Sequence, residues 1–189
     1  MKNRITLGLI AFVAFASLAF TNLVTKEVKV KESTIKWTGH KVTGSTHYGS
    51  IKLKEGTLNF EGDKLIGGMF VMDMNSIQTE DMDAEKNAYL TGHLKNDDFF
   101  GVEKHPTATL KITNARGHNH HYHVSGDLTI KGITKIVSFE MTVKDNTAST
   151  KFKIDRTQFD IKYGSASFFD NLKDKAISDE FDLDVTLKF

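Results

Sequence analysis

The stretch at residues 92–106 brings together several groups capable of acid–base chemistry. It holds two histidines, the adjacent carboxylates Asp97 and Asp98, two adjacent phenylalanines and the only proline of the chain. Two carboxylates act as general acid and base when both face one bond. Side chains of neighbouring residues diverge, so we interpret Asp97 and Asp98 as solvated loop carboxylates that pair with Lys95 or Lys104.

A second group is the histidine cluster at residues 118–123, which contains His118, His120, His121 and His123. In a strand, His121 and His123 would project from the same face about 7 Å apart. That spacing suits two metal ligands. Tyr122 and Val124 belong to the apolar face of this strand, which should point into the core. The two histidines would then point outward, where neighbouring strands offer mostly threonine and lysine. We therefore expect at most a weak surface chelator.

Nucleophilic catalysis finds little support in the sequence. The chain has no cysteine, and the run from Gly164 to Ser167 lacks the second glycine of a Gly-x-Ser-x-Gly elbow. We expect a protein that is not an enzyme. An enzyme or metal-handling protein that works through His93, Asp97 and the histidine cluster remains a second hypothesis.

In the elements that position these residues, apolar and polar side chains alternate with a period of two. At the end of the chain, the alternating apolar residues are Phe181, Leu183, Val185, Leu187 and Phe189. This pattern predicts a strand with one face on a core and one face in water. By similar patterns we expect further strands at residues 33–38, 48–53, 57–60, 64–74, 107–112, 122–130, 137–144 and 151–155.

Most of these strands are joined by short turns. Turn residues occur at 55–56, 61–63, 114–117, 131–134 and 145–147. Eight or nine strands joined this way favour an antiparallel barrel or sandwich, because closure removes exposed strand edges. Two connections are long: one at residues 75–106, with helix formers at 83–94, and one at residues 157–179.

A barrel of about eight strands is filled by side chains or holds one small ligand. The expected inward faces are apolar, and one strand carries Met69, Phe70, Met72 and Met74, which suit an irregular ligand or fill gaps in a core. Each long connection carries a Phe-Phe pair, at 99–100 and at 168–169. We expect one member of each pair to plug the core or the mouth of the barrel.

The N-terminus has the layout of a secretory signal peptide. Lys2 and Arg4 precede an apolar run, and small residues follow near Ala16 and Ala19. We expect residues 1–19 to be removed and residues 20–189 to form one domain of a periplasmic or secreted protein. The formal net charge of +1 becomes −1 without Lys2 and Arg4, which disfavours a nucleic-acid partner.

Several ordered motifs resemble the YceI-like family. They are the run Leu94-Lys95-Asn96-Asp97-Asp98-Phe99-Phe100 with Glu103-Lys104-His105-Pro106, the run Gly126 to Lys135, and the runs Phe152 to Phe159 and Tyr163 to Asn171. The resemblance spans about residues 26–189. It implies an all-β fold, an extended lipocalin-like antiparallel β-barrel of about eight strands with a short helix in a long connection.

The same resemblance implies an exported protein, often a homodimer, that holds a long apolar or amphiphilic lipid such as a polyisoprenoid, an isoprenoid quinone or a fatty amide. It brings no catalytic residues, and we expect no resident cofactor or metal. For the lipid tail we expect contacts with Trp37, Phe70, Met72, Phe99, Phe139 and Phe168. For the head group we expect Lys95 and Arg156. The alternatives are a metal-handling protein using the histidine cluster, or a stress-related or structural envelope protein whose barrel is packed solid.

Overall fold

The computed structural model describes residues 22–189, so the expected signal peptide lies outside the described residues. Nine strands dominate this part of the chain: β1 Leu23–Glu27, β2 Thr34–Lys41, β3 Thr46–Glu61, β4 Lys64–Thr79, β5 Thr107–His118, β6 His121–Ile130, β7 Ile133–Lys144, β8 Thr147–Asp155 and β9 Ile177–Lys188. One α-helix, α1 (Ala84–Lys95), and three 3-10 helices, at Val30–Glu32, Arg156–Phe159 and Lys173–Lys175, complete the described elements.

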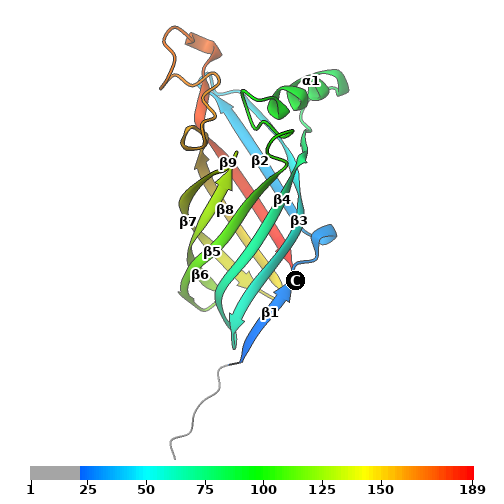
Figure 1. The fold of residues 1–189 in the computed structure, drawn as a ribbon, viewed down its shortest axis with the longest axis vertical. Helices are drawn as coiled ribbons and strands as arrows, with labels where there is room; N and C mark the ends of the chain where they lie inside the picture. The colour runs from blue at the N-terminus through cyan, green and yellow to red at the C-terminus, as the bar shows by residue number, and fades with distance from the viewer. Residues whose placement is uncertain (1–21) are drawn as a thin grey trace, which may run out of the picture.

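Eight of the strands close into an antiparallel barrel (Figure 1). The order around it is β3-β2-β9-β8-β7-β6-β5-β4, and pairing of β3 with β4 closes the ring. β1 pairs with the second half of β3, beyond the part of β3 that pairs with β2. The fold class expected from the alternating pattern is therefore confirmed.

Tight turns connect β6 to β7 and β7 to β8, as expected. Lys131 and Gly132 have φ angles of 51° and 74°, and Asp145 and Asn146 have φ angles of 50° and 56°. Two successive residues with positive φ match the twist of the flanking strands in a hairpin. The sequence signals for these two turns were sufficient because glycine, asparagine and aspartate tolerate this conformation.

Two expected turns are wrong. Residues 55–56 lie inside β3, which is one strand of 16 residues with a bulge between Leu53 and Glu55 rather than two strands. Gly56 is needed there because a Cβ would lie 2.9 Å from the Phe70 ring. Residues 114–117 lie inside β5, and the chain instead turns at Asn119 and His120. Barrel closure extends both strands past residues that otherwise favour turns.

One end of the barrel is packed solid. Buried residues from β3, β4, β6 and β7 meet there, and Phe60 packs against Phe189 with ring centroids 5.7 Å apart. The Tyr122 hydroxyl accepts a hydrogen bond from the Leu65 backbone N–H at 3.3 Å. These contacts close the end of the barrel near β1.

α1 and the connection from β8 to β9 lie at the other end (Figure 1). The helix expected within residues 83–94 is confirmed, and it begins after Asp83, whose side chain accepts a hydrogen bond from the Lys86 N–H at 2.9 Å. Among residues 22–189, no helix has the length and apolar character needed to cross a membrane.

Candidate functional site

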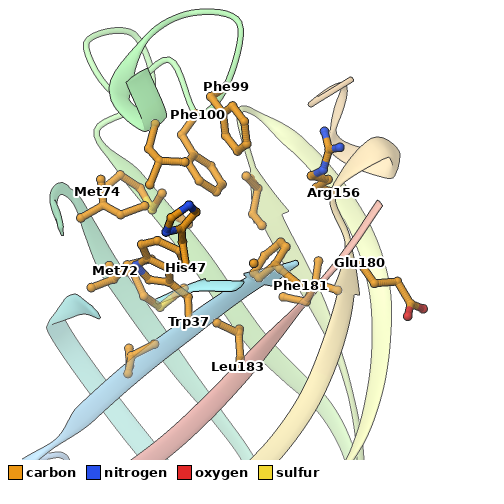
Figure 2. A pocket seen from close by; sticks show the side chains of 18 of the residues that line it. Trp37, His47, Met72, Met74, Phe99, Phe100, Arg156, Glu180, Phe181 and Leu183 are labelled. Carbon is orange, nitrogen blue, oxygen red and sulfur yellow. The ribbon is translucent and has the colours of Figure 1, made fainter. Parts of the chain in front are cut away.

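The barrel encloses a cavity of about 590 Å³ that extends from the end near α1 into the middle of the barrel. A pocket of this size and apolar character is typical of sites for small hydrophobic ligands. Figure 2 shows Trp37, Met72, Met74, Phe181 and Leu183 around it, with Phe99 and Phe100 at the mouth. The barrel is thus solid at one end and hollow at the other.

Strand alternation explains which side chains reach the cavity. On β4, Phe70, Met72 and Met74 all line it, whereas Met69 points outward and is 42% exposed. Met69 is therefore a surface side chain. On β7 and β8, Phe139 stacks on Phe152 with ring centroids 4.4 Å apart.

The indole of Trp37 occupies the wall beside a glycine on the neighbouring strand. Trp37 lies on β2 opposite Gly49 of β3, and its side chain is buried. A Cβ at Gly49 would lie 1.8 Å from the backbone oxygen of Gln78 and 2.8 Å from the indole. Only glycine lets β3, β4 and the indole approach this closely.

The aromatic pair at the end of α1 closes part of the mouth. Phe99 and Phe100 are both buried, with ring centroids 5.5 Å apart. We expected one member of the pair to plug the core or the mouth of the barrel; both are buried and line the cavity, because the chain is folded into consecutive turns here and not extended. In the second pair, Phe168 and Phe169 are both about half exposed, so neither plugs the barrel.

Arg156 is buried beside the mouth, and backbone carbonyls take most of its donors. Its guanidinium donates to the backbone oxygens of Ser178, Ile161, Tyr163 and Ile177 at 2.8–3.1 Å. Asp179 lies 3.7 Å away. Burial lowers the pKa of Arg156, against the charges of Asp179 and Asp155. These bonds hold the connection from β8 to β9 against the barrel.

Two histidines on the polar rim pair with carboxylates. His40 on β2 lies 2.6 Å from Asp182 on β9, and His47 on β3 lies 2.8 Å from Asp81 in the segment before α1. Both histidines line the outer part of the cavity. The rim is therefore polar and hydrogen-bonded, whereas the interior is apolar.

The YceI-like domain family matches residues 27–189 of this chain. The chain belongs to the YceI-like family. It is 30% identical to a UPF0312 protein of Yersinia pestis (strain Pestoides F) over 143 residues, which cover 72% of this chain and 68% of that protein. It is 29% identical to Protein YceI of Escherichia coli O157:H7 over 93 residues, which cover 49% of this chain and 47% of that relative. The matched part of this chain thus spans about half the length of that relative.

Solved structures share the YceI-like fold. BcnA of Burkholderia cenocepacia superposes with a TM-score of 0.67 at 20% identity, covering 85% of this chain and 98% of BcnA. A polyisoprenoid binding domain from Saccharophagus degradans, implicated in plant cell wall breakdown, gives a TM-score of 0.60 at 14% identity, covering 88% of this chain and 97% of that domain. At these identities the likeness concerns the fold.

In this YceI-like barrel, most residues expected at the ligand site lie on the cavity wall. These are Trp37, Phe70, Met72, Phe99, Phe139 and Arg156. Lys95 and Phe168 do not lie among the lining residues: Lys95 is the last residue of α1, and Phe168 lies half exposed in the connection from β8 to β9. Lining residues that the expectation missed include His93, Phe152, Phe181 and Leu183; the alternation of β8 and β9 already marked the last three as inward.

The carboxylates of the YceI-like motif at 92–106 face solvent. Asp97 accepts a hydrogen bond from Lys104, and this bond holds the pKa of the Asp97 carboxyl below its ordinary value. Lys104 was one of the two partners that the sequence predicted for these carboxylates. The Asp98 carboxylate lies 4.0 Å from Nδ1 of His93. The two carboxylates thus have different partners, as expected for adjacent residues.

The histidine cluster lies on the outer surface of the YceI-like barrel, at the closed end. His123 pairs with Glu140 at 2.8 Å, and His121 is 3.3 Å from the Thr142 hydroxyl. His118 is at the end of β5 and His120 is in the turn. In the described part of the chain, no group of three or more histidine, cysteine, aspartate or glutamate residues is arranged to hold a metal ion.

Proposed function

We propose that the protein binds one long-chain amphiphilic lipid in its barrel and carries or sequesters it in the cell envelope. Candidate ligands are a polyisoprenoid, an isoprenoid quinone or a fatty amide. The observation that carries the proposal is the apolar cavity of about 590 Å³ inside a barrel whose other end is solid. An apolar tail gains about 25 cal/mol for each Å² removed from water there.

The comparisons support a binding role. The chain belongs to the YceI-like family, and one structural relative is described as a polyisoprenoid binding domain. The geometry of the cavity favours binding over catalysis, because its wall is built mainly from aromatic and aliphatic side chains. An envelope location rests on the signal-peptide pattern at residues 1–19.

Trp37 provides a direct test, since it is the only tryptophan of the chain and lines the cavity. Titration with geranylgeraniol is expected to change Trp37 fluorescence saturably, with one ligand per chain. Ala108 of β5 is buried and also lines the cavity, so Ala108→Phe is expected to fill the cavity and weaken binding at least tenfold.

Ile136→Phe is the matched control, because Ile136 points outward from β7 and is 77% exposed. It adds a large ring without entering the cavity, and its titration is expected to match that of the unchanged protein. A linear, non-saturating fluorescence change, or equal binding by the Ala108→Phe variant, would argue against binding in the barrel.

A further inference from the structure

The cavity ends inside the barrel, at six buried residues that belong both to its lining and to the solid cluster at the other end. They are Ile35 of β2, Leu53 of β3, Phe70 of β4, Phe139 and Met141 of β7, and Leu187 of β9. We call them the floor residues. Because they come from five strands of the barrel, they close the inner end of the cavity from several sides.

Beyond the floor residues the interior of the barrel is filled. On β7 the lining ends at Met141, and Val143, the next inward residue, is buried in the solid cluster. On β8 Thr150 still lines the cavity, whereas Ala148 does not and is fully buried. Leu58 of β3 is also fully buried. A lipid tail that reached this level would have to displace closely packed side chains.

The Phe70 ring fills the inward space beside two glycines. Gly56 pairs with Phe70 across β3 and β4, and a Cβ at Gly56 would lie 2.9 Å from the ring. A Cβ at Gly68, which precedes Phe70 on β4, would lie 3.3 Å from the ring. Phe70 is only 3% exposed, so its ring is packed against the barrel wall. It therefore closes the cavity floor on the side of β3 and β4.

The distance from the mouth to the floor sets the length of tail that fits. Ile177 at the start of β9 and Leu187 near its end both line the cavity. The chain between them rises about 33 Å along the strand, or about 25 Å along the barrel axis at a strand tilt of about 40°. A fully extended chain advances about 1.2 Å per bond. The cavity therefore has room for about twenty carbons in line.

The volume of the cavity gives a similar limit. A group the size of a water molecule occupies about 30 Å³ in a liquid, and a methylene group is of comparable size. A cavity of about 590 Å³ therefore accommodates about twenty such groups. A much longer tail could not coil up inside, since the solid cluster beyond the floor residues leaves it no room.

We infer that the cavity selects lipid tails by length, with an upper limit of about twenty carbons set by the floor residues. Fatty amides and short prenyl lipids fall within this limit, whereas a long polyisoprenoid or a long-chain isoprenoid quinone would leave many carbons in water. Each such carbon loses the free energy of burial. This inference rests on the proposed lipid-binding function and narrows the class of ligand for the same site.

The test compares three prenols that share a hydroxyl head group and differ in tail length: farnesol, geranylgeraniol and solanesol. The tail of solanesol is roughly twice as long as the limit. Each prenol is offered to the full folded chain at equal mole fraction in phosphatidylcholine vesicles, and the lipid bound to the separated protein is measured by mass spectrometry. Geranylgeraniol is expected to bind with one molecule per chain.

Solanesol is expected to be taken up at least about a hundredfold less than geranylgeraniol. A tail that fits exchanges the bilayer interior for another apolar environment, which costs little free energy. The part of solanesol that does not fit would pass from the bilayer into water, which costs free energy for every exposed carbon.

Two variants test the position of the floor. Leu187→Trp raises the floor with a larger side chain, so it is expected to lower the ratio of geranylgeraniol to farnesol uptake at least about threefold. Ala108→Phe obstructs the part of the cavity nearer to α1 and is expected to weaken the uptake of both prenols. Ile136→Phe, on the outer face of β7, is the control and is expected to keep the ratio of the unchanged protein.

The outcomes separate the length limit from the proposed function. If none of the three prenols is taken up by the folded protein, the proposed function fails. If solanesol is taken up as well as geranylgeraniol or better, the length limit is overturned while lipid binding stands. A folded Leu187→Trp variant with an unchanged ratio would contradict the assignment of the floor. The comparison of prenols on the unchanged protein decides the length limit even if this variant does not fold.

Discussion

At the scale of single residues, Arg156 illustrates how a buried charge organises the mouth of the cavity. Its guanidinium holds backbone carbonyls of two chain segments, before and after the exposed connection at residues 164–176. It also lies over the Phe99 ring, 5.8 Å from the centroid. One side chain therefore links this connection to the motif that follows α1.

Arg156→Lys is expected to lower the free energy of unfolding by about 3 kcal/mol, because an ammonium cannot reproduce the planar set of donors and leaves buried carbonyls unpaired. Urea denaturation measures the loss. Lys153→Ala is the control, since it removes an exposed ion pair with Glu180 at 3.5 Å and is expected to cost under about 1 kcal/mol. Equal effects of the two substitutions would contradict the structural role of Arg156.

The environment of Asp155 predicts that part of the folding stability of the protein is lost in acid. Partial burial works to raise the pKa of Asp155, but hydrogen bonds from the Thr157 hydroxyl and N–H and from Gln158 outweigh it and hold the pKa below its ordinary value. A depressed pKa contributes stability above the unfolded-state value that is lost as the pH falls through the folded-state value.

Asp155→Asn removes this titration. The variant is expected to be less stable than the unchanged protein at neutral pH, with a difference that shrinks below about pH 4. Chemical denaturation across a pH series measures the difference. A constant difference at every pH would show that the carboxylate's charge is not what matters.

Six of the eight residues expected at the ligand site do line the cavity. The sequence did not predict which groups surround the polar residues among them. Arg156 was expected to meet the head group of a lipid. Its actual partners are backbone carbonyls that come together only when β9 folds beside the 3-10 helix at Arg156–Phe159. Such backbone partners leave no pattern in the side-chain sequence.

At the scale of elements, the strands were predictable and their lengths were not. The alternation in β6, β7 and β9 marked the inward faces correctly, as shown by buried Val124, Phe139 and Leu187. The turn residues at 114–117 did not end β5, because pairing with β6 continues to His118. Register and length depend on the partner strand, which local patterns do not contain.

Gly49 gives an element-scale prediction. Gly49→Ala places a Cβ against the Gln78 carbonyl and the Trp37 indole, so it is expected to cost about 3 kcal/mol of stability and to shift Trp37 fluorescence. Gly39→Ala on β2 is the matched control, because a Cβ there meets nothing within 4 Å. Comparable stabilities of the two variants in urea would contradict the close approach of β3 and β4.

At the scale of the whole molecule, the protein is a barrel with a solid end and a hollow end. The sequence indicated the barrel through its alternation and its family resemblance, but the inward faces of both halves are equally apolar. Whether such a barrel is filled or hollow depends on strand tilt and side-chain volumes around the ring. The cavity therefore became visible only in the structure, and the alternative of a solidly packed barrel is wrong for the end near α1.

The most direct test of the account is a native mass spectrum of the protein as purified from the envelope fraction, with solvent extraction and identification of any bound lipid. We expect one amphiphilic lipid per chain, retained by the unchanged protein and the Ile136→Phe control and lost in the Ala108→Phe variant. A bare protein that also rejects added long-chain lipids would contradict lipid binding in the barrel.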